Sequence, residues 1–279
     1  MCNIQQVQLE CNNKIISYNV INIDNDLLIT ETRTKPLELT LKQVLEEIKT
    51  FDYDDYYHKQ GGKDNKVADD ACLPPFNLSF YEWSYIKDQI PTPEQFVDEY
   101  IDCFWEESTQ IKGKYFLKPE YKNQICDNNS GRKFSNNSFS YDEIAARACR
   151  AYCSFVREII LYLILCQEKD FSVSYSFQED WSKGKDLIVE YKGLQFKIKC
   201  SQESKKAEEY NQKKETTTRR TEPVNNDMVI RINYNSQNKK NEHYGEIHFF
   251  PSEVVQELIN KIKRLEKEIR EKGGNLNEF

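Results

Sequence analysis

The chain has 279 residues, enough for one large domain or two small ones with a sizeable core. It contains no apolar run near 18 residues and no cationic, apolar leader, so we expect a cytoplasmic protein that does not enter a membrane. The net charge of −7 divides into −12 for residues 1–110 and +5 for residues 111–279, which favours local contact with phosphates over coating of DNA.

The first 125 residues are expected to form an accessory α+β region that provides substrate specificity or binds a partner. Alternating apolar residues punctuated by Asn12-Asn13 and Asp24-Asn25 predict a small antiparallel sheet. Two Thr-x-x-Gln capping boxes, which begin at Thr40 and Thr92, predict two helices.

A long helix is expected near the start of residues 135–250, which we predict to be the core of the protein. Ser140 and Glu143 form a capping box, and apolar residues follow at helical spacing. Residues 159–165 are apolar on all sides but too few to span a bilayer, which predicts a buried helix end. Glu158 stands directly before this apolar run.

Residues 185–200 predict two short strands joined by the turn Lys192-Gly193, because glycine in a two-residue loop is typical of a tight hairpin. This turn places Asp186 opposite Lys199. Side chains alternate between the faces of a strand, so one face is apolar and the other carries Asp186, Lys197 and Lys199.

The chain continues with a predicted strand at residues 228–234 and a C-terminal helix at residues 251–274. The apolar seam of that helix consists of Val255, Leu258, Ile262, Leu265 and Ile269. Two interpretations are open: the seam packs on its own domain, or it joins two chains into a homodimer.

The hairpin and the preceding helix resemble the PD-(D/E)XK nuclease superfamily. In that family an Asp opens one strand of a hairpin, and the partner strand carries an acid or Gln, one spacer and a Lys. Asp186 matches the Asp, Lys199 matches the Lys, and Glu158 stands where a metal-linked Glu of the helix is expected. The resemblance implies an α/β (α+β) fold, with a mixed central sheet flanked by helices in a restriction-endonuclease-like core behind the accessory region.

The same resemblance implies a reaction. The expected function is hydrolysis of DNA phosphodiester bonds with Mg²⁺ or Mn²⁺, in restriction, defence or mobile-element biology. Asp186 would be the principal metal ligand and Glu158 a second or water-mediated one. Lys199 would stabilise the attacking water and the charge on the phosphate.

Lys197 departs from the family pattern, because it stands where the family has its acid. An ammonium group there cannot bind Mg²⁺ and would repel it. Three interpretations are open: a contact to the DNA backbone, a catalytic adaptation, or a mark of lost activity. The last would make the chain a degenerate nuclease-fold subunit that binds nucleic acid or a protein partner. Asp186 opposite Lys199 also fits a surface ion pair on an ordinary hairpin.

Lysines surround the predicted hairpin. Those expected to contact nucleic-acid phosphates are Lys185, Lys197, Lys205 and Lys206. DNA is the expected polymer, and RNA is the alternative.

Overall fold

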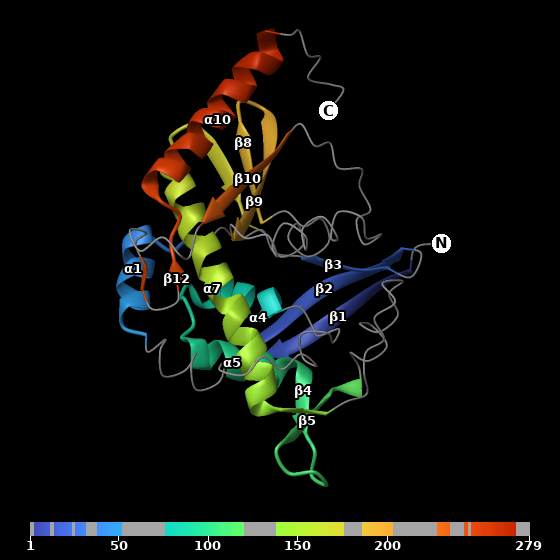
Figure 1. Cartoon of the computed structure of the whole chain (residues 1–279). Coiled ribbons are helices and arrows are strands. Elements are labelled where there is room, and N and C mark those ends of the chain that lie inside the picture. Colours follow the sequence, from blue (N-terminus) through green and yellow to red (C-terminus); the bar gives the residue numbers. More distant parts are fainter. Residues whose placement is uncertain are drawn as a thin grey trace. The chain divides into compact units, whose positions relative to one another are not determined.

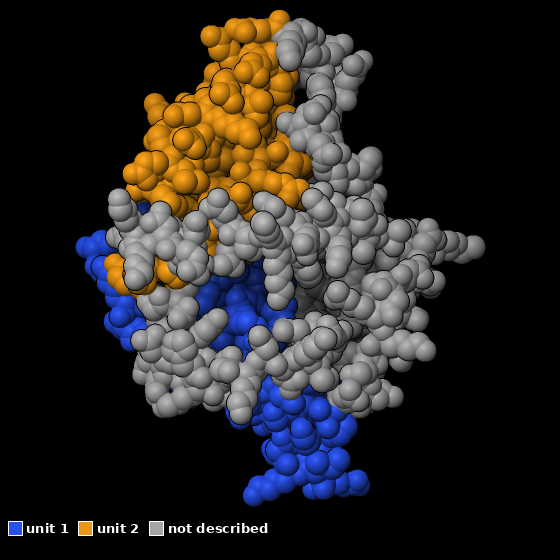
Figure 2. Space-filling view, viewed as in Figure 1, with its two compact units in different colours: residues 1–155 blue, residues 156–279 orange. Residues whose placement is uncertain are grey.

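The computed structural model describes residues 3–11, 14–23, 26–31, 38–51, 76–119, 138–175, 186–202, 228–234, 243–244 and 247–271, the first three stretches by their backbone alone. The chain divides into two compact units, Met1–Phe155 and Val156–Phe279 (Figure 2). The fold is mixed α+β, with small sheets and helices (Figure 1).

The N-terminal segment forms the predicted antiparallel sheet. Its strands are β1 (Asn3–Cys11), β2 (Lys14–Ile23) and β3 (Asp26–Glu31). Cys11 pairs with Lys14 and Ile23 pairs with Asp26, which leaves two residues for each connection. The turn residues Asn12-Asn13 and Asp24-Asn25 therefore predicted both connections correctly.

Helices and a second small sheet complete the first unit. They are α1 (Leu41–Lys49), α4 (Phe76–Glu82), the π-helix η1 (Trp83–Lys87), α5 (Pro93–Phe104), β4 (Trp105–Glu107), β5 (Lys114–Leu117), β6 (Phe139–Ser140) and the beginning of α7 (Tyr141–Leu165). Both Thr-x-x-Gln capping boxes are present, with each Thr side chain accepting a hydrogen bond from the backbone N–H of its Gln.

Aromatic side chains from three helices form the centre of this unit. Phe80, Phe96, Tyr152 and Phe155 lie with ring centroids 5.4–6.0 Å apart. The Tyr152 hydroxyl donates a hydrogen bond to the Pro91 carbonyl at 2.6 Å. The polar end of this buried tyrosine is therefore satisfied.

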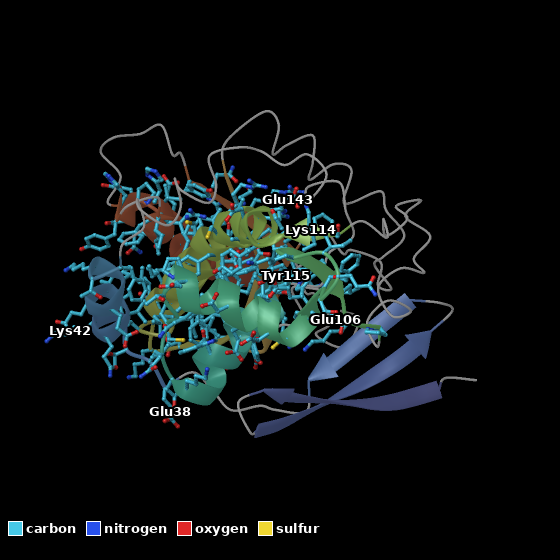
Figure 3. The ribbon with its side chains drawn as sticks, turned by 90° about the horizontal axis from the view of Figure 1, so that it is seen from below. Glu38, Lys42, Glu106, Lys114, Tyr115 and Glu143 are labelled. Carbon is cyan, nitrogen blue, oxygen red and sulfur yellow. The ribbon has the colours of Figure 1, made fainter. Side chains whose placement is uncertain are left out.

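Helix α7 begins at its predicted capping box. The Ser140 N–H donates to Glu143 Oε2 at 2.6 Å, and the Glu143 N–H donates to Ser140 Oγ at 3.2 Å. Lys114 of β5 lies 3.9 Å from the same carboxylate (Figure 3). These contacts give Glu143 a structural role at the start of the helix.

The second unit contains a four-stranded mixed sheet in the order β10-β9-β8-β7. Its strands are β7 (Phe171–Ser174), β8 (Leu187–Tyr191), β9 (Leu194–Gln202) and β10 (Val229–Tyr234). Strands β7, β8 and β9 are antiparallel neighbours, whereas β9 and β10 are parallel. A parallel pair requires a crossover, and residues 203–228 provide its length.

The predicted hairpin register is confirmed. Tyr191 pairs with Leu194 and Ile188 with Lys197. The core face is buried and consists of Leu187, Val189, Tyr191, Leu194, Phe196 and Ile198. The opposite face carries the polar side chains, as the alternation required.

The hairpin turn has positive φ at both central residues, 50° at Lys192 and 82° at Gly193. This backbone matches the right-handed twist of the strands. A Cβ on Gly193 would meet no heavy atom within 4 Å, so a substitution there would cost conformational strain and cause no clash.

Gly193→Ala should destabilise the second unit by about 1 kcal/mol, because an L-residue at this φ is strained. Gly193→Asn should cost less, since Asn tolerates the left-handed region. Urea unfolding followed by circular dichroism measures both. Equal stability of the Ala variant and the wild type would contradict the proposed strain.

A short two-stranded ribbon and the last helix complete the second unit. They are β11 (His243–Tyr244), β12 (Ile247–His248) and α10 (Ser252–Glu271). Helix α10 runs along the sheet and contacts β8 and β10 (Figure 1). Val255, Leu258 and Ile262 of its seam are buried, and Leu265 and Ile269 are half-buried. Most of the apolar seam of α10 therefore packs within the second unit.

Helix α10 also holds the hairpin turn. The buried Glu266 lies 3.5 Å from Lys192 Nζ and is hydrogen-bonded to Arg270 Nε. Arg270 Nη2 donates to the Lys192 carbonyl at 2.9 Å. The turn and the end of α10 thus share one ionic network.

This network should make the second unit sensitive to acid. The hydrogen bond from Arg270 lowers the pKa of Glu266. Its stabilisation is complete above the ordinary Glu pKa of about 4.3 and is lost as the pH falls through the lower folded-state value. Glu266→Gln should therefore have a lower urea midpoint than wild type at pH 7, with a smaller difference at about pH 2.5.

Glu268→Gln is the matched control, because Glu268 is an exposed partner of Arg264 on the same helix. Its urea midpoint should follow that of wild type at both pH values. A Glu266→Gln deficit that is unchanged in acid would contradict the role of the ionised carboxylate.

Within the described ranges, no helix is long and apolar enough to cross a membrane. The cysteines whose side chains the structure describes are reduced: Cys103, Cys149, Cys153, Cys166 and Cys200. Burial raises the pKa of Cys149 to about 12, so this residue stays protonated and cannot serve as a nucleophile at neutral pH.

Candidate functional site

Asp186 lies beside strand β9, next to Lys199. Asp186 directly precedes β8, and its N–H donates to the Ile198 carbonyl at 3.2 Å. Its Oδ2 accepts a hydrogen bond from the Cys200 N–H at 2.5 Å. Backbone contacts therefore fix the carboxylate against the strand that carries Lys199.

Strand β10 adds a cation that the sequence reasoning missed. Because β10 runs parallel to β9, Arg231 is the register partner of Lys199. Lys197 and Lys199 are half-buried and Arg231 is exposed. One face of the sheet thus carries two carboxylates, Asp186 and the exposed Glu190, together with the cations Lys197, Lys199 and Arg231, and we call these three cations the cationic face.

The last turns of α7, which include Glu158, pack against the ends of two strands. The guanidinium of Arg157 lies over Tyr234, at the end of β10, and Tyr162 packs against Tyr175, directly after β7. The ends of β7 and β10 lie at the same end of the sheet as Leu187, where β8 begins. The helical turn that carries Glu158 therefore lies between these two contacts to the sheet.

Glu158 is buried, and its Oε2 has no contact with solvent. Burying a carboxylate is costly unless a cation or hydrogen-bond donors accompany it. Glu158 is thus either part of an internal polar network or a ligand directed at a cation.

Asp186 and Glu158 are the two carboxylates that were expected to hold a metal ion. Mg²⁺ is commonly held by one or two carboxylates together with waters. Among the described residues there is no group of three or more His, Cys, Asp or Glu side chains that could hold a metal. Lys197 supplies a positive charge where a further acid would be expected.

A second polar cluster joins α7 to the end of β10 and the β11–β12 ribbon. Arg157 is 4% exposed, its Nε donates to the His248 carbonyl at 2.5 Å, and its guanidinium carbon lies 3.5 Å from the Tyr234 ring centroid. The rings of His243 and His248 stack at 5.2 Å. We call Arg157, Tyr234, His243 and His248 the Arg157 cluster.

No sequence pattern predicts this cluster. Residues 157, 234 and 248 are distant in the chain and meet only through tertiary packing. Three of the expected phosphate contacts, Lys185, Lys205 and Lys206, lie outside the described residues.

Comparison of the chain with protein-family models, curated protein sequences and solved structures found no significant match.

Proposed function

We propose that the second unit is the core of a PD-(D/E)XK-type endonuclease that hydrolyses DNA phosphodiester bonds with one divalent metal ion. The observation that carries this proposal is the position of Asp186, directly before β8, beside Lys199 in the antiparallel strand β9, on one polar face. Restriction, defence and mobile-element processes are the settings that the resemblance implies.

The order of elements also supports the proposal. Helix α7, strand β7, the β8–β9 hairpin and strand β10 follow one another as the resemblance implies. Residues 203–227, between the hairpin and β10, lie outside the described residues. The mixed sheet agrees with the expected central sheet.

Each residue has a separate role in this proposal. Asp186 and Glu158 would hold Mg²⁺ or Mn²⁺. Such an ion, when bound, polarises the phosphate and favours deprotonation of water. Lys199 would orient the attacking water and neutralise charge that develops on the phosphate oxygens. Lys197 and Arg231 would attract and align the DNA backbone.

A second candidate is a nuclease-fold subunit that binds nucleic acid without cleaving it. Lys197 favours it, because its register partner Ile188 is the second residue after Asp186 and the ammonium lies on the same face. A positive charge there opposes metal binding and assists phosphate binding. Both candidates require the cationic face to contact the polymer, and they differ only in metal binding and cleavage.

A plasmid-nicking assay separates the candidates. The endonuclease should convert supercoiled DNA to open-circular or linear DNA in Mg²⁺ or Mn²⁺ and should be inactive in EDTA. DNA that is bound but intact in every metal would overturn the endonuclease proposal and support the binding subunit. A parallel assay with single-stranded RNA tests the alternative polymer.

Lys197→Glu is the most informative substitution at the cationic face. If the ammonium opposes metal binding, the variant should bind Mg²⁺ more tightly in calorimetry and cleave DNA faster. If Lys197 holds a phosphate, the variant should bind DNA more weakly, and the slope of log K against log salt should fall by about one.

Gln195→Glu is the matched control, because Gln195 is exposed on the same face of β9. It adds a carboxylate farther from Asp186 and should change Mg²⁺ affinity little. An equal gain in both variants would mean that general charge, and not the position of Lys197, controls metal binding.

A further inference from the structure

We infer that the Arg157 cluster is a phosphate-binding subsite, distinct from the cationic face. Arg157 is almost wholly buried, and its two described contacts are uncharged: the carbonyl of His248 and the ring of Tyr234. No carboxylate among the described residues pairs with it. A buried cation without an anion is costly, so an anionic ligand would complete the site.

The geometry of the guanidinium N–H donors matches the oxygens of a phosphate group. Arginine offers five N–H donors in a planar fork, and the Nε donor is used by the His248 carbonyl. The terminal N–H groups can bind two oxygens of one phosphate. Stacking on Tyr234 and the bond to His248 fix the orientation of the fork, so little entropy is lost when a ligand binds.

The surroundings of Arg157 allow a nucleotide to approach. Tyr234 and His248 are half-buried and His243 is exposed, so the cluster reaches the surface. The histidine rings stack with an interplanar angle of 22°. Flat rings beside a phosphate-binding fork suit a nucleotide, because a base can stack on them while its phosphate meets the arginine.

The ligand class is therefore a phosphate group, supplied by a nucleic-acid strand or by a free nucleotide. Only the choice of polymer depends on the proposed function. Binding at the Arg157 cluster requires neither metal nor cleavage. It can therefore be measured in EDTA, where inactivity of the proposed endonuclease does not affect the result.

The test uses the full chain and two variants in EDTA. Inorganic phosphate is titrated at constant ionic strength with chloride as the balancing anion, and the melting temperature is recorded. A short single-stranded oligodeoxynucleotide is titrated in parallel by fluorescence anisotropy. Arg157→Gln removes the fork. Arg264→Gln is the matched control, because Arg264 is an exposed partner of Glu268.

Wild type and Arg264→Gln should show a saturable rise in melting temperature with phosphate, and Arg157→Gln should lose it. Oligonucleotide affinity should fall by about tenfold or more in Arg157→Gln. Loss of the phosphate effect with unchanged oligonucleotide binding would assign the subsite to free nucleotides or phosphate. If Arg157→Gln does not fold, Arg157→Lys replaces it, because it keeps the charge but loses the fork and should still weaken both responses.

Two results would overturn the inference. One is a wild-type protein whose melting temperature responds equally to phosphate and chloride. The other is a folded Arg157 variant with wild-type phosphate and oligonucleotide affinity. Either would mean that the charge of Arg157 is balanced from within the chain.

Discussion

Asp186→Asn should lower the rate of metal-dependent DNA cleavage by about a hundredfold or more. The substitution removes the charge that would hold the metal ion. It keeps a side-chain oxygen that can accept the Cys200 N–H, a bond that fixes the end of β9. The fold should therefore survive, as circular dichroism and the urea midpoint would show. Asp186→Ala should lose this bond as well as the activity.

Glu190→Gln is the control for this loss. Glu190 lies on the same strand and the same face, but it is exposed and far from the end of β9. It removes one negative charge without touching the proposed metal site, so cleavage should be close to that of wild type. Equal rates for wild type and Asp186→Asn would exclude Asp186 as a metal ligand.

Ile262→Glu should destabilise the second unit by about 4 kcal/mol or more. Ile262 is fully buried, and α10 contacts β8 and β10. A carboxylate there would lose its hydration without gaining a partner. Chemical unfolding should show the loss directly, and the variant should accumulate as aggregated or degraded protein.

The homodimer through the C-terminal helix is a separate proposal, and Ile262 is unsuited to test it because the residue serves the core. Ile269 is half-buried near the end of the helix, so Ile269→Glu should change stability little. If the helix joins two chains, this variant should be monomeric in light scattering while wild type is dimeric. A monomeric wild type at high concentration would exclude the homodimer.

Local signals in the sequence predicted the elements that depend on neighbouring residues. The register from Tyr191 to Leu194 followed from a two-residue turn that contains glycine, and it located Asp186 opposite the end of β9. The capping boxes at Thr40, Thr92 and Ser140 predicted three helix starts. In each case the determining contacts lie within a few residues of one another.

Contacts between distant parts of the chain could not be predicted in this way. The parallel pairing of β9 with β10 depends on a crossover and on core packing. The sequence alone therefore does not predict that Arg231 is the register partner of Lys199. Arg157 meets Tyr234 and His248 for the same reason. Strands as short as β6, with two residues, are below the length at which alternation can be recognised.

The sequence predicted the positions of the candidate site residues in the sheet better than it predicted their effect on metal binding. Alternation placed Lys197 on the polar face with Asp186, and the sheet register agrees. Whether that ammonium opposes metal binding depends on its distance from the ion and on the local dielectric, which no sequence pattern specifies.

The most direct measurement of the central claim is the location of Mn²⁺ by anomalous diffraction from crystals soaked in the ion. We expect one peak at about 2.0–2.6 Å from carboxylate oxygens of Asp186 and Glu158. The peak should disappear in Asp186→Asn. A peak elsewhere, or no peak in protein that still binds DNA, would contradict the proposed metal site and leave the chain as a nucleic-acid-binding subunit.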